Sequence, residues 1–70
     1  MNEIVGSRIK DRREALKMTQ VDLANASRVS RGTISALENG RSDNVKIGTL
    51  KALAKTLDTT IDYFFALTVQ

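Results

Sequence analysis

The side chains best suited to a chemical task lie between positions 30 and 41, in the segment SRGTISALENGR. Those expected to face outward are small or form hydrogen bonds: Ser30, Arg31, Gly32, Thr33, Ser35 and Ala36. An arginine near a helix start can donate two hydrogen bonds to O6 and N7 of guanine, and small neighbours allow close approach to base edges. The chemistry that this segment favours is therefore recognition of double-stranded DNA. An ordinary surface arginine is the alternative interpretation of Arg31.

The composition argues against an active site. The 70 residues contain no His, Cys or Pro. Imidazole and thiol catalysts, Cys/His zinc sites, disulfides and redox centres are thereby removed. Paired carboxylates and a glycine-rich phosphate loop do not occur at a recognisable spacing. We therefore expect no enzyme, no cofactor and no small-molecule substrate.

The length of the chain supports only one small hydrophobic core. We expect a single domain over residues 1–70, with a core built mainly from Leu, Ile, Val and Ala, since three residues are aromatic: Tyr63, Phe64 and Phe65. No apolar run approaches the roughly 20 residues of a membrane span, and residues 1–5 lack the pattern of a signal peptide. A cytoplasmic protein without a membrane partner is the expectation.

Positive charge is concentrated in one half of the chain, whose formal net charge is +3. Residues 1–41 hold eight Lys or Arg against five acids, whereas residues 42–70 hold three of each. A basic region of this kind is typical of proteins that meet DNA phosphates. Solvated helix faces with a chance excess of cations explain the composition equally well.

The spacing of apolar residues predicts the elements that must position the segment. Residues 4–17 form a first helix of about four turns, with Ile4, Val5, Ile9 and Leu16 near one stripe. A second helix over residues 19–27 begins with a capping-box variant of Thr19 and Asp22, and its inward residues are Leu23 and Ala24.

A third helix over residues 30–39 is capped by Ser30, ends before Gly40 and turns Val29, Ile34 and Leu37 inward. Residues 41–45 form a loop, and a fourth helix follows over residues 47–57. Residues 58–60 give a turn and cap, and a fifth short helix begins at Ile61. The sequence therefore predicts an all-α, compact five-helix fold.

The second and third helices, joined by a tight turn, have the layout of a helix-turn-helix, which holds its second helix in the major groove. The segments MTQVDLA (18–24) and VSRGTISALENGR (29–41), with LAKTL (53–57) and IDYFF (61–65), resemble the lambda and 434 repressor and Cro family over residues 4 to about 66. The resemblance implies a repressor-like domain that regulates transcription. Such a domain binds a palindromic operator in double-stranded DNA as a homodimer, with its third helix in the major groove.

The resemblance also implies roles for particular residues. Phosphate contacts fall to Gln20, Asn39 and Arg41, and base contacts to Arg31, Gly32 and Ala36, with Ser30 and Thr33 beside them. Arg13 and Glu38 match a partly buried ion pair between the first and third helices. Lys17 and Arg28 stand where the family commonly has Gly, so a left-handed backbone at either would be strained by about 1 kcal/mol.

The C-terminal segment carries more apolar surface than a short helix can bury, through Ile61, Tyr63, Phe64, Phe65, Leu67 and Val69. The resembled family forms its dimer through the corresponding region, so Ile61, Tyr63 and Phe65 are the expected interface. Packing of all these residues on the chain's own core is the alternative. For the protein as a whole, the alternative is a protein-interaction or antitoxin-like module that keeps the fold.

Overall fold

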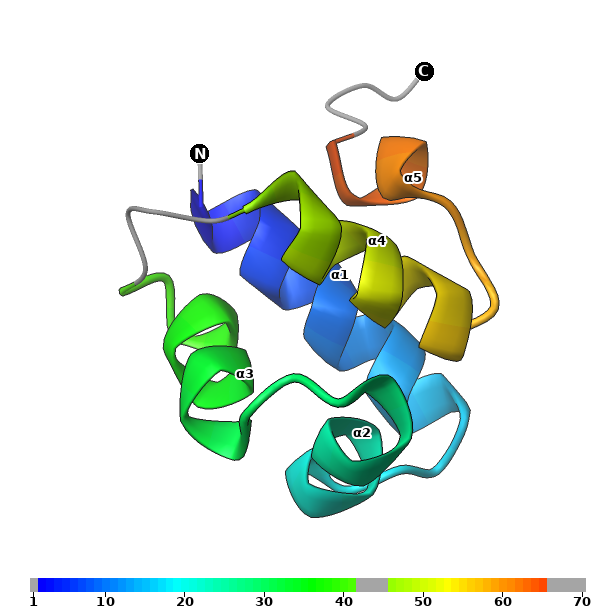
Figure 1. The fold of residues 1–70 in the computed structure, drawn as a ribbon. Coiled ribbons are helices and arrows are strands. Elements are labelled where there is room, and N and C mark those ends of the chain that lie inside the picture. Colours follow the sequence, from blue (N-terminus) through cyan, green and yellow to red (C-terminus); the bar gives the residue numbers. More distant parts are fainter. Residues whose placement is uncertain (1, 42–45, 66–70) are drawn as a thin grey trace.

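The computed structural model describes residues 2–41 and 46–65, and within these ranges the chain forms five helices (Figure 1). Their bounds are α1 Asn2–Ala15, α2 Gln20–Ser27, α3 Arg31–Glu38, α4 Ile47–Thr56 and α5 Ile61–Phe65. The all-α, five-helix prediction is confirmed. None of these helices combines the length and the apolar character needed to cross a membrane.

The helices are arranged so that α2 and α3 share one end of the molecule. α2 packs on α3 and α4, while α1 packs on α3 and α5. α5 contacts α1 and α4 and lies at the end of the molecule away from α2 (Figure 1). The helix pair α2–α3 is therefore held from behind by α1 and α4.

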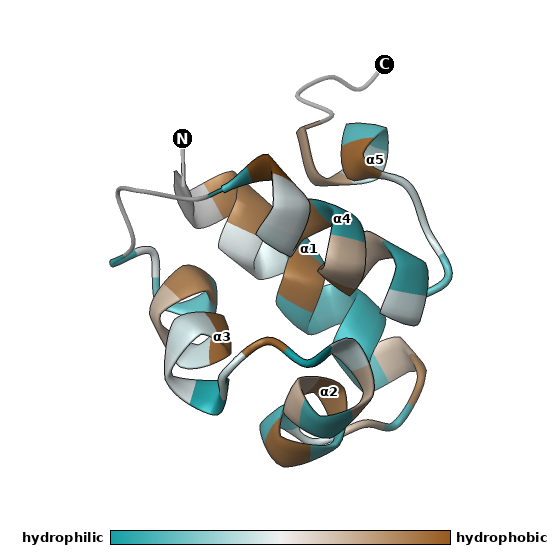
Figure 2. Ribbon diagram, viewed as in Figure 1, coloured by the Kyte–Doolittle hydropathy of each residue, from teal (hydrophilic) through white to brown (hydrophobic). Residues whose placement is uncertain are grey.

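One hydrophobic core joins the five helices. Ten apolar side chains are buried in it: Val5, Ile9, Leu23, Ile34, Leu37, Leu50, Leu53, Ala54, Leu57 and Phe64. Hydrophobic and hydrophilic segments alternate along the helices, as expected of helices that bury one side (Figure 2). The inward placement expected for Leu23, Ile34 and Leu37 is confirmed, and Val29 and Ala24 pack at the edge of the core, partly buried.

The prediction that Ile4, Val5, Ile9 and Leu16 lie near one apolar stripe of α1 is wrong for the first and the last of these residues. Val5 and Ile9 are buried, but Ile4 is 39% exposed and Leu16 is 41% exposed. Ile4 precedes Val5 by one residue and is therefore rotated about 100° away from it around the helix axis. Leu16 directly follows Ala15, the last residue of α1.

The side-chain caps predicted from the sequence are present. The backbone N–H of Asp22 donates to Thr19 Oγ1 at 3.0 Å, and the N–H of Thr19 donates to Asp22 Oδ2 at 2.9 Å. At the start of α3, the N–H of Thr33 donates to Ser30 Oγ at 3.1 Å. Each cap satisfies a backbone donor that has no partner inside the helix.

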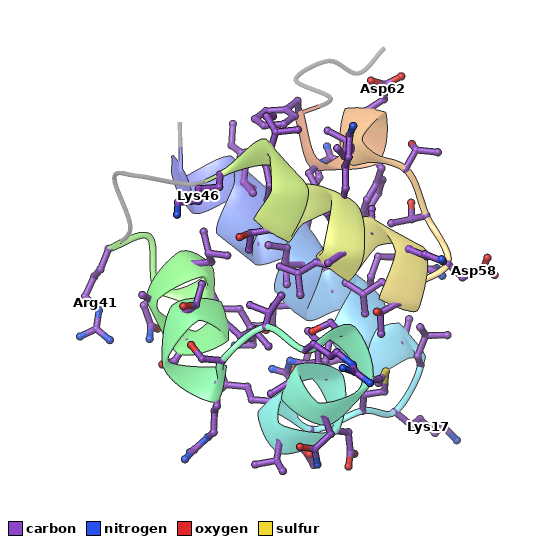
Figure 3. All side chains as sticks on the ribbon, viewed as in Figure 1. Lys17, Arg41, Lys46, Asp58 and Asp62 are labelled. Atoms are coloured by element: carbon purple, nitrogen blue, oxygen red, sulfur yellow. The ribbon has the colours of Figure 1, made fainter. Side chains whose placement is uncertain are left out.

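Charged residues in the left-handed conformation end three of the helices. Lys17, Arg28 and Asp58 have φ values of 59°, 64° and 56°, and Gly40 ends α3 with φ 69°. The left-handed backbone considered for Lys17 and Arg28 is thus confirmed, and a non-glycine residue is strained there. The side chains of Lys17 and Asp58 point away from the body of the molecule (Figure 3).

Gly6 is a close-contact position that the sequence analysis did not identify. It is buried in α1, where a Cβ atom would collide with the backbone carbonyl oxygen of Leu37 and come within 3.0 Å of Glu38 Cα. α1 therefore meets the end of α3 backbone to backbone. The absence of a side chain at Gly6 sets how closely α3 lies to the core.

Candidate nucleic-acid interface

α3 presents a small, open face to solvent. Arg31, Gly32 and Thr33 are exposed and Ala36 is half-buried, while Ile34 and Leu37 on the opposite side are buried. Apart from its two chain neighbours and the backbone of its own helix, a Cβ atom built on Gly32 would meet no atom within 4 Å. No other described part of the domain therefore covers the backbone of α3 at this position.

The hydroxyl groups at the start of α3 bind one another. Besides accepting from the Thr33 N–H, Ser30 Oγ donates to Thr33 Oγ1 at 2.8 Å. A bond between two hydroxyl groups uses one of their two protons, so one hydroxyl proton of the pair remains for an outside acceptor. Ser30 is in addition the structural cap of α3.

The turn between α2 and α3 is tight and tied to the helix before it. The N–H of Arg28 donates to the Ala24 carbonyl oxygen at 2.9 Å, and the left-handed Arg28 then reverses the chain. The buried Ser27 hydroxyl accepts from the Val29 N–H at 3.2 Å. These contacts fix the angle at which α3 leaves α2.

An open hollow of about 560 Å³ lies beside this turn. Its lining combines apolar and polar side chains from both helices: Val21, Ala24, Asn25, Arg28, Val29, Ser30 and Arg31. Within residues 2–41 and 46–65, neither Arg28 nor Arg31 takes part in an ion pair. Two guanidinium groups at one edge of α3 are thus available to an anionic partner.

An ion pair joins α1 to the end of α3, as the resemblance implied. Arg13 Nε donates to Glu38 Oε2 at 2.8 Å and Arg13 Nη2 donates to Glu38 Oε1 at 2.9 Å. The two side chains are 11% and 4% exposed. The hydrogen bonds to Glu38 raise the pKa of Arg13, although burial opposes this shift. This pair belongs to the frame of the domain and not to its outer face.

The first residue of α2 also reaches this ion pair. Gln20 Nε2 donates to Glu38 Oε1 at 3.1 Å, so the half-buried Gln20 side chain lies against the end of α3. The amide has a second N–H for another acceptor. Gln20 is thereby held beside Glu38, the last residue of α3.

The other two residues expected to contact phosphates follow the last residue of α3. Asn39 is exposed, and its Nδ2 lies 3.4 Å from Ser35 Oγ. Arg41 is exposed, and its side chain points away from the domain (Figure 3). Arg31 and Arg41 therefore flank α3 at its two ends.

A helix-turn-helix family model matches residues 9–64, which include both helices of this unit and the helices that support it. The chain belongs to the helix-turn-helix family. Its all-α fold is that of the family's small DNA-binding transcriptional regulators.

A curated relative shares sequence with nearly all of this helix-turn-helix chain. It is an uncharacterized transcriptional regulator in the ATPase CF(0) region of Rhodospirillum rubrum, 40% identical over 62 residues. The aligned part covers 89% of this chain and 56% of the relative. The chain thus spans only about half the length of that protein.

Solved helix-turn-helix structures share the fold. The restriction-modification controller protein C.AhdI from Aeromonas hydrophila has a TM-score of 0.85 and 28% identity, with 91% of this chain and 96% of that chain covered. The clp gene regulator ClgR from Corynebacterium glutamicum has a TM-score of 0.83 and 31% identity, with coverages of 91% and 67%.

An enzyme also contains this fold. Hydroxypropylphosphonic acid epoxidase from S. wedmorenis has a TM-score of 0.80 and 30% identity, and the match covers 90% of this chain but 33% of the epoxidase. The similarity is confined to one third of that enzyme. The epoxidase is thus another protein that contains a helix-turn-helix domain. The similarity gives no reason to expect epoxidation by this chain.

Three arginines of the helix-turn-helix domain's first helix bind inside the chain. Arg8 lies over the Tyr63 ring, 5.0 Å from its centroid, and Arg12 donates to the carbonyl oxygen of Leu57. Arg13 binds Glu38, so each of the three has a partner inside the chain. Arg8 and Arg12 were expected only as positive charge, because partners 45 or more positions away leave no local signal.

The residues expected at a dimer interface differ in their exposure. Phe65 is 41% exposed, whereas Ile61 and Tyr63 are partly buried against the core. Phe64 between them is fully buried. Leu67 and Val69 lie outside the described residues. The homodimer therefore stays a prediction, and Phe65 is its most accessible apolar side chain among those described in α5.

Proposed function

We propose that this chain is a sequence-specific transcriptional regulator that binds a palindromic operator in double-stranded DNA as a homodimer. The observation that carries the proposal is the open face of α3, where Arg31 is exposed and unpaired within the described residues and Gly32 has free space around it. A helix with this face fits the major groove of B-form DNA.

Each side chain of the interface has a task that suits its chemistry. Arg31 donates to a guanine, while Gly32 and Ala36 approach bases closely or contact a thymine methyl group. Gln20, Asn39 and Arg41 bind phosphates on either side of the groove, and Thr33 adds a hydroxyl donor. Ser30 chiefly fixes the start of α3, because its hydroxyl already bonds to Thr33.

The relatives support a regulatory role for the domain. The Rhodospirillum protein is named as a transcriptional regulator, and C.AhdI and ClgR are named as a controller and a regulator. We propose repression as the mode of regulation and no enzymatic activity. A bound α3 fills the groove that another DNA-binding protein would need.

The exposed Phe65 supports a two-fold dimer through α5. α5 lies at the end of the molecule away from α2 (Figure 1). Pairing of two copies through α5 leaves both α3 helices free, and adjacent half-sites in B-form DNA are about 34 Å apart.

Selection from a random duplex pool at about 150 mM salt tests the proposal. We expect an inverted repeat with half-site centres about 10 base pairs apart, bound at least about a thousandfold more tightly than scrambled DNA. Weak binding without enrichment would overturn the proposal and favour a protein-interaction module with the same fold.

A further inference from the structure

We propose that Glu38 is a positioning residue for DNA binding, which holds the Gln20 amide in the orientation that a phosphate requires. The inference rests on the proposed function and adds a residue that does not itself contact DNA. Its basis is one carboxylate oxygen that accepts from two side chains. Glu38 Oε1 lies 2.9 Å from Arg13 Nη2 and 3.1 Å from Gln20 Nε2.

The carboxylate determines which end of the Gln20 amide faces inward. A Gln amide has a donor end and an acceptor end, and rotation by half a turn exchanges them. Against Glu38, the reversed amide would place its oxygen beside a carboxylate oxygen. The observed hydrogen bond therefore keeps the NH₂ group inward and leaves its second N–H for a further acceptor.

Arg13 makes this arrangement compatible with a nearby phosphate. A lone carboxylate at the end of α3 would repel DNA phosphates and would be costly to bury. Arg13 donates to both oxygens of Glu38, whose side chain is 4% exposed. Glu38 can then serve as an acceptor for Gln20 without an unbalanced negative charge.

Arg13 also binds the segment that precedes α2. Arg13 Nη1 donates to the carbonyl oxygen of Met18 at 2.8 Å. Met18 lies two residues before Gln20. Arg13 therefore binds the main chain before α2 directly, and it holds the Gln20 side chain through Glu38. Ordering these groups before binding removes part of the conformational entropy lost when DNA binds.

A double-mutant cycle in operator binding tests the positioning role. Affinities of wild type, Gln20→Ala, Glu38→Ala and the double variant are measured by fluorescence anisotropy, at a temperature where circular dichroism shows each to be folded. We expect Glu38→Ala to weaken binding about fivefold more in the wild-type background than in the Gln20→Ala background. General effects of charge or stability occur in both backgrounds and cancel.

Two further variants separate positioning from stability. Glu38→Gln keeps one carbonyl oxygen as an acceptor, so we expect it to restore most of the coupling with Gln20 while lowering the unfolding midpoint. Leu53→Val lowers stability from the buried core and should show no coupling with Gln20. In the free protein, the heteronuclear NOE of the Gln20 side-chain amide should fall on Glu38→Ala and be retained in Leu53→Val.

The outcomes distinguish a failure of the positioning role from a failure of the proposed function. Specific DNA binding by the wild type, together with equal effects of Glu38→Ala in both backgrounds, would overturn the positioning role alone. An unchanged Gln20 amide NOE in Glu38→Ala would do the same. A wild-type protein without specific DNA binding would overturn both this inference and the proposed function.

Discussion

The guanidinium group of Arg12 binds the carbonyl oxygen of Leu57, with Nε at 3.2 Å and Nη2 at 2.8 Å. Leu57 is the C-cap of α4, whose last carbonyl groups lack partners inside the helix. One side chain of α1 thus closes the end of α4, and the favourable charge at a helix C-terminus adds to the hydrogen bonds.

Arg12→Met should lower the free energy of unfolding by about 1–2 kcal/mol, because the Leu57 carbonyl loses its donor. Chemical denaturation followed by circular dichroism measures the change. Lys10→Met is the matched control, since Lys10 is exposed on the same helix, and it should change stability little. Equal effects of the two substitutions would show that the Arg12 contact adds nothing.

Gly6→Ala should destabilise the domain by about 1–3 kcal/mol or more, because its Cβ atom would collide with the Leu37 carbonyl oxygen and push α1 from α3. Thermal unfolding gives the comparison. Gly48→Ala is the control, since a Cβ atom there meets nothing within 4 Å and alanine is the better helix former. A Gly6→Ala protein as stable as the Gly48→Ala protein would contradict the close contact.

Lys17→Gly and Asp58→Gly should each stabilise the protein by up to about 1 kcal/mol, because both residues adopt positive φ angles. The gain is partly offset by the greater freedom of glycine in the unfolded chain. Lys51→Gly, inside α4, should instead cost about 1 kcal/mol. The free energy of unfolding from denaturant titrations tests the three variants, and a loss at all of them would refute the strain argument.

Arg31→Ala should relax base preference at one position of each half-site and cost about 1–3 kcal/mol of discrimination. Gln20→Ala should weaken binding to operator and scrambled DNA alike, because a phosphate contact does not read sequence. Binding of both variants to a panel of single-base operator changes distinguishes the roles. Equal losses on all sequences for both variants would refute the assignment.

Phe65→Glu should raise the dimer dissociation constant at least about tenfold while the monomer stays folded, since Phe65 is 41% exposed. Analytical ultracentrifugation over a concentration series measures the effect. Phe64→Ala is the contrasting variant, because Phe64 is fully buried and its loss should destabilise the fold itself. Unchanged association of the Phe65→Glu protein would place the interface elsewhere.

Local signals explain what was predictable from the sequence. Thr19 and Ser30 were assigned as caps because a cap acts within three residues of itself, and both assignments are confirmed. The inward positions Ile34 and Leu37 followed from helical spacing. The Arg13–Glu38 ion pair was expected only from the family resemblance, since nothing in the residues between them pairs the two charges.

Contacts between distant segments explain what was not predictable. The tasks of Gly6, Arg8 and Arg12 depend on how α1 crosses α3, α4 and α5, and no local spacing encodes those crossings. Gln20 was expected to act outward, but its bond to Glu38 required the structure. Leu16 was misplaced because the first helix ends at Ala15, two residues before the predicted end at position 17.

The backbone contact at Gly6 belongs to the inner side of α3, which is distinct from the outer face proposed to bind DNA. Ile34, Leu37 and the close approach to Gly6 hold the helix from within, while Arg31, Gly32 and Thr33 are exposed and Ala36 is half-buried. The three exposed residues can therefore be exchanged as a set without refitting the core, and Ala36 can be exchanged for side chains of similar size. Libraries of this domain can be randomised at these positions. New DNA sequence preferences can then be selected while the rest of the fold stays the same.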